Sequence, residues 1–206
     1  KVSSPGPPPA SRTRSRRTPV RRSTISTSVV PAGTTARELI EEYAGGMLEG
    51  HEFYGYLPGG ASGGMLPASK ADLPLDFDTL QDHDCFIGSA AIVVLSDRDS
   101  AKEAAHNLMH FFAHESCGQC TPCREGTGWL HKVVKKLRRG EGVEGDIDLL
   151  EHVCDGMAGL TICPLADAAV MPMRSFIDKF RPEFEALIQE TAPAVPATRW
   201  PRGEQE

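Results

Sequence analysis

The sequence predicts an α+β fold, in which a small mixed module at about residues 33–97 precedes a helical bundle at about residues 98–190. The first observation is a change in the apolar period, from two residues before Ser100 to 3.6 residues after it. The second is a set of short segments rich in β-branched and aromatic residues between 51 and 97. A chain of 206 residues is long enough to bury one sizeable core or two small ones.

The mixed module is expected to begin with a helix and to continue with short strands. A threonine at 34 or 35 can cap a helix over ARELIEEYA, with Leu39, Ile40 and Tyr43 facing inward, and the helix should stop at Gly45-Gly46. Strands are predicted over 51–58, 74–80 and 85–97. The last of these has the longest β-branched run and ends at a turn-forming Ser96-Asp97.

Four apolar faces with a helical period predict four helices after Ser100. These faces are formed by Ala101, Ala104, Ala105, Leu108, Met109 and Phe112; by Leu130, Val133, Val134 and Leu137; by Ile147, Leu150, Val153 and Met157; and by Met173, Phe176, Ile177, Phe180, Phe184 and Leu187. Because proline removes a backbone donor, Pro172 or Pro182 is expected to break the last helix.

Both ends of the chain are expected to be disordered. Residues 1–32 are rich in arginine, proline and serine and have too few apolar residues to offset the entropy of ordering them. An organelle transit peptide is the alternative interpretation, although Pro7-Pro8-Pro9 disfavours the amphipathic helix that such a peptide needs. Residues 191–206 contain three prolines and no apolar period.

Charge and hydropathy argue against two classes of protein. The net charge is −6, but residues 1–36 hold seven cations and no acid, so the remaining 15 cations face 28 acids, a net of −13. A body this acidic is not expected to bind nucleic acid. The longest apolar runs, such as AAIVVL at 90–95, are too short to insert into a membrane. With no apolar stretch near the start that resembles a secretory signal, a cytoplasmic location is expected.

The cysteines predict a metal centre. Three of them, Cys117, Cys120 and Cys123, follow a C-x-x-C-x-x-C spacing on a loop that leads into a helix with Pro122 in its first turn. Zinc sites usually take their thiolates as two separated C-x-x-C pairs. Three thiolates at this spacing plus one distant cysteine are typical of a 4Fe-4S cluster. A structural zinc site is the alternative.

Two cysteines could supply the distant ligand. Cys163 lies in a predicted loop between helices, followed by Pro164, whereas Cys154 lies within a predicted helix. Because a loop can wrap a cluster, Cys163 is the expected fourth ligand and Cys154 a buried structural thiol. Cys85 is expected in the core of the mixed module.

Two other groups of side chains are candidates for binding. His106, His110 and His114 recur every four residues and could hold a metal, although the border of an amphipathic helix is the simpler interpretation. The cationic run over 132–139 is expected either to be a solvated helix end or to dock on an acidic partner.

The segments ESCGQCTPCREGTGWL (115–130) and TICPLADAAVMPMRSFIDKFRPEFE (161–185) resemble the NADH-binding flavoprotein subunit of respiratory complex I. The same type of subunit recurs as the beta subunit of NAD-dependent formate dehydrogenases and in NAD-reducing hydrogenases. Residues 55–80 and 85–97 resemble the ubiquitin-like, soluble-ligand-binding (SLBB) β-grasp domain of that family. Their amino-acid sequence is most similar to the formate dehydrogenase branch. The resemblance covers about 33–190.

The resemblance implies an electron-transfer role. Cys117, Cys120, Cys123 and Cys163 would ligate a 4Fe-4S cluster that exchanges electrons between an FMN/NAD(H) site and further iron–sulfur centres. FMN and NAD belong to the full-length protein of this family, whose flavin domain has a GRGGAGFPTG-like signature that this sequence lacks. The first β-grasp hairpin also lacks a counterpart. The chain is therefore expected to be the C-terminal part of such a protein, or a truncated homologue, that does not oxidise NADH alone.

The expected partners are other subunits of an oxidoreductase complex, among them an iron–sulfur/thioredoxin-like subunit and a catalytic subunit. Two other functions fit the residues. One is a zinc-stabilised interaction domain without a redox role, and the other is a ligand-binding β-grasp module with a structural cluster. Iron and sulfide content separates the first of these from the electron-transfer role.

Overall fold

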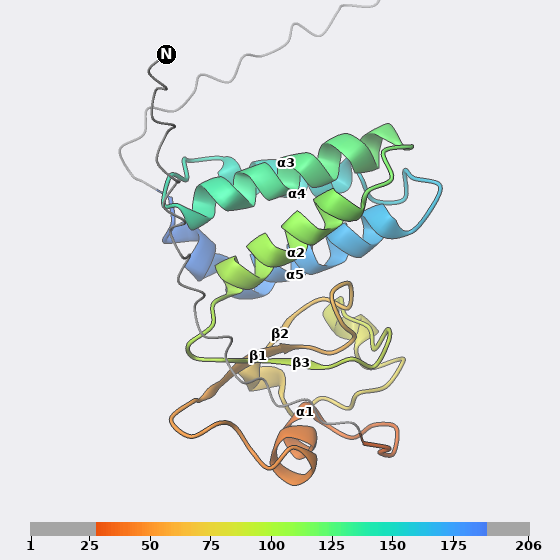
Figure 1. Ribbon diagram of the computed structural model, residues 1–206, viewed down its shortest axis with the longest axis vertical. Coiled ribbons are helices and arrows are strands. Elements are labelled where there is room, and N and C mark those ends of the chain that lie inside the picture. The colour runs from red at the N-terminus through yellow and green to blue at the C-terminus, as the bar shows by residue number, and fades with distance from the viewer. Residues whose placement is uncertain (1–27, 189–206) are drawn as a thin grey trace, which may run out of the picture.

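The structure is a computed structural model that describes residues 28–188, shown as a ribbon in Figure 1. The fold is α+β, as predicted. The named helices and strands are α1 (Ala36–Glu38), β1 (Phe53–Leu57), β2 (Leu66–Pro67), β3 (Val93–Ser96), α2 (Ala101–Glu115), α3 (Thr121–Arg138), α4 (Asp146–Asp155) and α5 (Leu165–Glu185). The segments predicted to be disordered, 1–32 and 191–206, lie outside the described residues except for 28–32.

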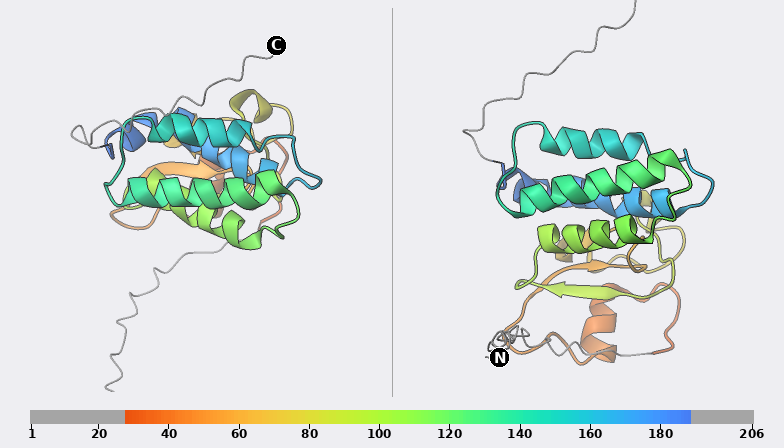
Figure 2. Two further views of the ribbon diagram at one scale, coloured as in Figure 1. Left: turned by 90° about the horizontal axis from the view of Figure 1, so that it is seen from above. Right: turned by 45° about the horizontal axis from the view of Figure 1, so that its top comes forward.

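The elements are stacked in layers, with the sheet between α1 and the four longer helices (Figure 1). The turned view in the right panel of Figure 2 shows the same order. Helix α5 contacts β2, and α2 packs on both α3 and α5, so the four longer helices form one body over one face of the sheet. No helix in the described part of the chain is long and apolar enough to cross a membrane.

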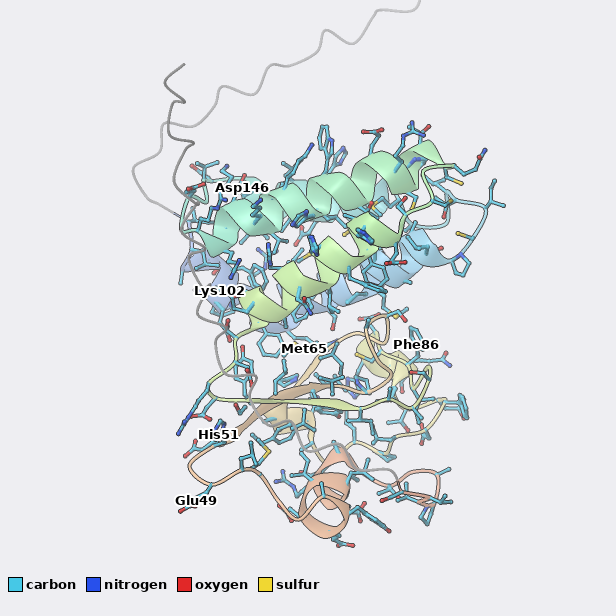
Figure 3. The ribbon with its side chains drawn as sticks, viewed as in Figure 1. Glu49, His51, Met65, Phe86, Lys102 and Asp146 are labelled. Atoms are coloured by element: carbon cyan, nitrogen blue, oxygen red, sulfur yellow. The ribbon has the colours of Figure 1, made fainter. Side chains whose placement is uncertain are left out.

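The sheet is antiparallel, with the order β2-β1-β3. Strand β1 lies in the middle, and its pairing with β3 shifts register between Phe53 and Gly55, so the two-residue alternation of side chains does not hold there. Tyr54 packs against the core of the helices, whereas Tyr56 belongs to a separate cluster on the other face, with Leu66 and Leu80. Met65, labelled in Figure 3, belongs to the helical core, so the segment beside β2 joins the two halves of the molecule.

The strand predicted over 74–80 is wrong. The segment forms turns, with Leu75 and Leu80 buried as apolar anchors. The Asp76 carboxylate accepts hydrogen bonds from the backbone N–H groups of Asp78 and Thr79 and from the Thr79 hydroxyl. Because a side chain satisfies these donors locally, the backbone does not need a sheet partner.

The strand predicted over 85–97 is much shorter in the structure, where only Val93–Ser96 is extended and paired. Gly88 and Ala90 have φ values of 47° and 54°, in the left-handed region, so a strand cannot run through them. The prediction that Cys85 lies in the core is confirmed, since it is 2% exposed.

The first helix begins as predicted at Thr35, which forms a capping box with Glu38. The inward position predicted for Tyr43 is wrong, since this side chain is 41% exposed. The helix widens into a π-helical turn over Leu39–Tyr43, closed by a 2.9 Å hydrogen bond from the N–H of Ala44 to the carbonyl of Leu39. A wider turn rotates each later side chain away from its α-helical position, which keeps Ile40 buried but carries Tyr43 outward.

The four predicted helices of the bundle are present, and most of their predicted apolar faces are buried. Helix α5 is interrupted at Phe180, where φ is −126° and ψ is 22°, two residues before Pro182. Pro172 lies within the regular part of the same helix. Pro182 is thus the proline at which α5 bends.

A stripe of polar side chains on α5, one residue per turn, joins the helix to the mixed module. Ser175 donates to the carbonyl of Met65 at 2.7 Å and accepts from its N–H at 2.8 Å. Lys179 donates to the carbonyl of His83 at 2.6 Å, and Glu183 accepts a hydrogen bond from the Tyr54 hydroxyl. We call Ser175, Lys179 and Glu183 the α5 stripe.

Candidate metal centre

The C-x-x-C-x-x-C segment forms the connection between α2 and α3. Helix α2 ends at Glu115, the N–H of the C-cap residue Ser116 still bonds the carbonyl of Phe112, and Cys120 is the N-cap residue of α3. Gly118 has a φ of 78°, which lets the chain turn back between the helices. Pro122 lies in the first turn of α3, as predicted. We call residues 116–123 the three-cysteine loop.

Cys163 lies on the connection between α4 and α5, residues 156–164, which we call the Cys163 loop. Figure 1 shows this loop and the three-cysteine loop at the same end of the four helices, and both panels of Figure 2 agree. Asp146, labelled in Figure 3, marks the opposite end.

A close approach of helix and loop holds this end together. A Cβ atom added to Gly126 of α3 would lie 2.3 Å from the sulfur of Met157, so any larger residue there would force the Met157 side chain to move. Met157 is 1% exposed and lies at the start of the Cys163 loop. The close packing of Gly126 on Met157 therefore fixes where the Cys163 loop begins relative to the first turns of α3.

The four candidate ligands differ in exposure. Cys117 and Cys163 are exposed, Cys120 is half-buried, and Cys123 is buried. Within residues 28–188, no three His, Cys, Asp or Glu side chains are gathered as a metal site requires. The fold thus brings both cysteine loops to one end of the helices but does not gather the four sulfur atoms.

Two side chains fix the shape of the three-cysteine loop from either side of Gly118. The Ser116 hydroxyl accepts a 3.4 Å hydrogen bond from the N–H of Gly118, and its oxygen lies 3.3 Å from the Cys123 sulfur. Arg124 donates to the carbonyl of Gly118 at 2.7 Å. The Thr127 hydroxyl donates to the backbone carbonyl of Cys123 at 2.7 Å rather than to its sulfur.

The residues of this loop fit an iron–sulfur cluster. The donors of the motif are thiols, which are the ligands that such clusters take. The positive end of α3 and the guanidinium of Arg124 lie at the same loop, and both favour the negative charge of thiolates and sulfides. The loop therefore offers three thiols in a setting that stabilises an anionic group.

The other two cysteines are in apolar surroundings. Cys154 is 0% exposed within the helical core, and burial raises the pKa of its thiol to about 12. Burial also raises the pKa of Cys85, against the opposing charge of Lys179 at 3.5 Å. Both environments favour the protonated thiol, whereas a metal ligand must be a thiolate.

The histidines singled out by spacing separate into two environments. His106 and His110 lie against His131 of α3, with ring centroids 5.3 and 5.1 Å away, while His114 contacts Glu115 at 3.0 Å. Burial, and after it neighbouring positive charge, lowers the pKa values of His106 and His131. His131 was not among the histidines that the helical spacing singled out, because it comes from a different helix.

The cationic run ends in ion pairs at the other end of α3. Lys136 contacts the buried carboxylate of Asp146 at 2.8 Å, and Arg138 contacts Glu103 at 2.7 Å. These contacts tie α3 to α4 and to α2. Lys136 and Arg138 thus have intramolecular partners, while Arg138 remains on the exposed side of α3, as the predicted solvated helix end requires.

Ser116 lies in the three-cysteine loop and Gly126 follows it in α3, and neither was predicted as a site residue. Ser116 adjoins the cysteine motif, so its hydroxyl was the available signal. The need for glycine at 126 depends on Met157, 31 residues later, and no local pattern shows it.

Residues 103–187 match the family model described as the NADH-ubiquinone oxidoreductase-F iron-sulfur binding region. An NADH-quinone oxidoreductase F subunit of Rhizobium meliloti (strain 1021) is 43% identical over 161 residues, which cover 78% of this chain and 38% of that protein. The mitochondrial 51 kDa subunit of NADH-ubiquinone oxidoreductase of Neurospora crassa is 41% identical over 158 residues, or 76% of this chain and 32% of that protein.

A solved structure has a similar fold over most of this chain. An NAD+-reducing [NiFe]-hydrogenase in the H2-reduced state superposes with a TM-score of 0.69 and 29% sequence identity, over 78% of this chain and 27% of the hydrogenase chain. The present chain thus spans less than two fifths of the length of these two curated relatives.

Proposed function

Because this chain belongs to the family of NADH-quinone oxidoreductase F subunits and contains that family's iron–sulfur binding region, we propose that it carries electrons through a 4Fe-4S cluster. The ligands are the three cysteines of the three-cysteine loop, Cys117, Cys120 and Cys123, together with Cys163. The observation that carries the proposal is the position of the two cysteine loops at one end of the four helices.

A cluster bound there supplies one-electron transfer, and the chain supplies its position and surroundings. Buried Cys123 and half-buried Cys120 anchor the inner side of the site, and exposed Cys117 and Cys163 close it from the surface. Cys163 is exposed and lies outside the helical core, so its side chain is accessible to a cluster held by the three-cysteine loop.

We further propose the finer division of the chain. Residues 33–97 form an incomplete SLBB-type β-grasp domain, and residues 98–190 form the cluster-binding helical bundle. The three-stranded sheet with α1 on one face supports the first of these assignments. FMN and NAD(H) bind elsewhere, in the part of the relatives that this chain does not span.

We propose that the chain works beside other subunits of an oxidoreductase complex, among them an iron–sulfur/thioredoxin-like subunit and a catalytic subunit. Leu160 and Ile162, on the Cys163 loop, are 61% and 85% exposed. Apolar side chains this exposed beside a redox centre suit an interface. Co-purification with the tagged chain, followed by mass spectrometry, tests which catalytic subunit is present.

Metal analysis of the full chain, purified without oxygen, tests the proposal. We expect about four irons and four sulfides per chain and a paramagnetic signal on reduction with dithionite. Stoichiometric zinc without sulfide would instead support the zinc-stabilised interaction domain.

A matched pair of cysteine variants tests the fourth ligand. Cys163→Ser should lose or destabilise the cluster, whereas Cys154→Ser should keep it with a modest loss of stability from burying a hydroxyl. Iron content and visible absorbance of both variants decide between them. The opposite result would place the fourth ligand on α4.

A further inference from the structure

We propose that the Ser116 hydroxyl tunes the reduction potential of the bound cluster by donating a hydrogen bond to the sulfur of Cys123. This inference rests on the proposed function, because it takes Cys123 as a cluster ligand. Ser116 is a positioning residue in this role, since it acts on the cluster through the sulfur of Cys123.

The direction of the hydrogen bond follows from the ligand's protonation state. The Ser116 oxygen and the Cys123 sulfur are 3.3 Å apart, and in the free thiol either atom could donate. A ligating cysteine is a thiolate with no proton to give, so the hydroxyl must be the donor. The N–H of Gly118 donates to the same hydroxyl oxygen at 3.4 Å, so the hydrogen of the Ser116 hydroxyl remains available to the sulfur.

The position of this pair makes the hydrogen bond electrostatically effective. Cys123 is 6% exposed and Ser116 is half-buried, so water competes weakly for the sulfur. A hydrogen bond in such surroundings is stronger than in water. Reduction adds negative charge that the sulfurs share, so the hydroxyl stabilises the reduced state more than the oxidised state. Ser116 therefore raises the reduction potential.

The chain offers a matched control for this hydroxyl. Thr127 lies one turn after Cys123, is 1% exposed, and donates to the backbone carbonyl of Cys123 rather than to its sulfur. Thr127→Val removes a hydroxyl close to the same cysteine with little change in volume. Ser116→Thr keeps a hydroxyl at position 116, so it serves as the conservative variant.

The experiment is a redox titration of the full chain with its cluster, followed by electron paramagnetic resonance. Ser116→Ala should shift the ratio of reduced to oxidised cluster about tenfold toward the oxidised form at a given potential, which is about 59 mV for one electron. Ser116→Thr and Thr127→Val should titrate like the unaltered chain. A Ser116→Ala midpoint equal to that of the unaltered chain, or an equal shift in Thr127→Val, overturns the proposal.

A second measurement applies even if Ser116→Ala fails to assemble a cluster. Resonance Raman spectra of the unaltered chain in H2O and D2O should differ in the iron–cysteine stretching bands, because the donated proton exchanges. Thr127→Val should retain this isotope shift, and its absence from the unaltered chain overturns the proposal. A chain without iron and sulfide contradicts the proposed function itself, and the inference fails with it, whereas a normal cluster with neither effect contradicts the inference alone.

Discussion

At the scale of single residues, two glycines of α3 have opposite roles although they are only two positions apart. A Cβ atom at Gly126 would collide with Met157, whereas a Cβ at Gly128 would have nothing within 4 Å. Gly126 is therefore needed for contact with the Cys163 loop. Gly128 lowers the stability of the helix, because glycine has a low helix propensity and no close contact requires it at this position.

Gly126→Ala is expected to destabilise the protein by roughly 1–3 kcal/mol, because the added methyl group overpacks a closed contact. Gly128→Ala is the matched control and should stabilise it by up to about 1 kcal/mol through helix propensity. Urea unfolding of both variants measures the two effects. Equal free energies of unfolding for the two variants would show that Gly126 and Met157 do not pack as described.

Histidine residues give the stability a dependence on pH. The pKa values of His106 and His131 are lowered in the folded protein, first by burial and then by positive charge on Arg138 and on the neighbouring histidines. As the pH falls below the unfolded value of about 6.5, the unfolded chain takes up protons first. The free energy of unfolding therefore has its full value above that pH and declines below it.

Replacing His131 removes part of this dependence. His131→Gln should lose less stability than the unaltered chain between about pH 7.5 and pH 5.5, measured as the shift in urea midpoint. His114→Gln is the control, because His114 contacts Glu115 at the end of α2, whereas the ring contacts of His131 are with His106 and His110. A parallel decline in all three proteins would assign the pH dependence to other groups.

At the scale of elements, the sequence predicted the long helices better than the short strands. Each bundle helix has several apolar residues on one face, and this repetition outweighs any single residue. The strands depend on local competition instead. Asp76 accepts hydrogen bonds from backbone N–H groups that a strand would use for pairing. Gly88 and Ala90 have left-handed φ values within the segment predicted as the last strand. Neither effect changes the apolar pattern, so neither was visible in it.

The contact between β1 and the helices depends on the hydroxyl of Tyr54. This hydroxyl donates to Glu183 of α5 and accepts from the N–H of Ala101, the first residue of α2. Tyr54→Phe should cost about 1–3 kcal/mol, because it leaves a partly buried carboxylate and a helix N–H without this partner. Tyr43→Phe, at an exposed position, should be nearly neutral in the same denaturant titration. A cost below that of Tyr43→Phe would contradict the role of Tyr54.

At the scale of the whole molecule, we expect the α5 stripe to couple the unfolding of the sheet to that of the helices. Ser175 satisfies both the N–H and the carbonyl of Met65, and these groups lie in the interior. Ser175→Ala should cost about 1–3 kcal/mol for each group left unsatisfied, and it weakens the junction between the two units. We expect the single thermal transition to broaden or to divide into two in calorimetry. A single sharp transition at the original temperature would show that apolar packing alone joins the units.

The candidate site was predictable in part. The spacing of Cys117, Cys120 and Cys123 identifies a metal-binding loop without any tertiary information. The position of Cys163 depends on how α4 returns the chain, and the exposed Cys163 loop and buried Cys154 follow from packing. The sequence favoured Cys163 as the fourth ligand because it lies in a predicted loop. No sequence pattern could show that this loop and the three-cysteine loop lie at the same end of the helices.

The junction between the two units also determines where the chain can be divided. The family match begins at residue 103, two residues inside α2, so a fragment cut there would lose the Ser100 cap and the Tyr54 contact with Ala101. It would also uncover Phe180, whose ring lies 5.4 Å from that of Tyr54. Such a fragment is expected to aggregate. The smallest piece that keeps its core closed therefore includes β1 and β2, and boundaries for expression belong before Phe53 rather than at the edge of the matched region.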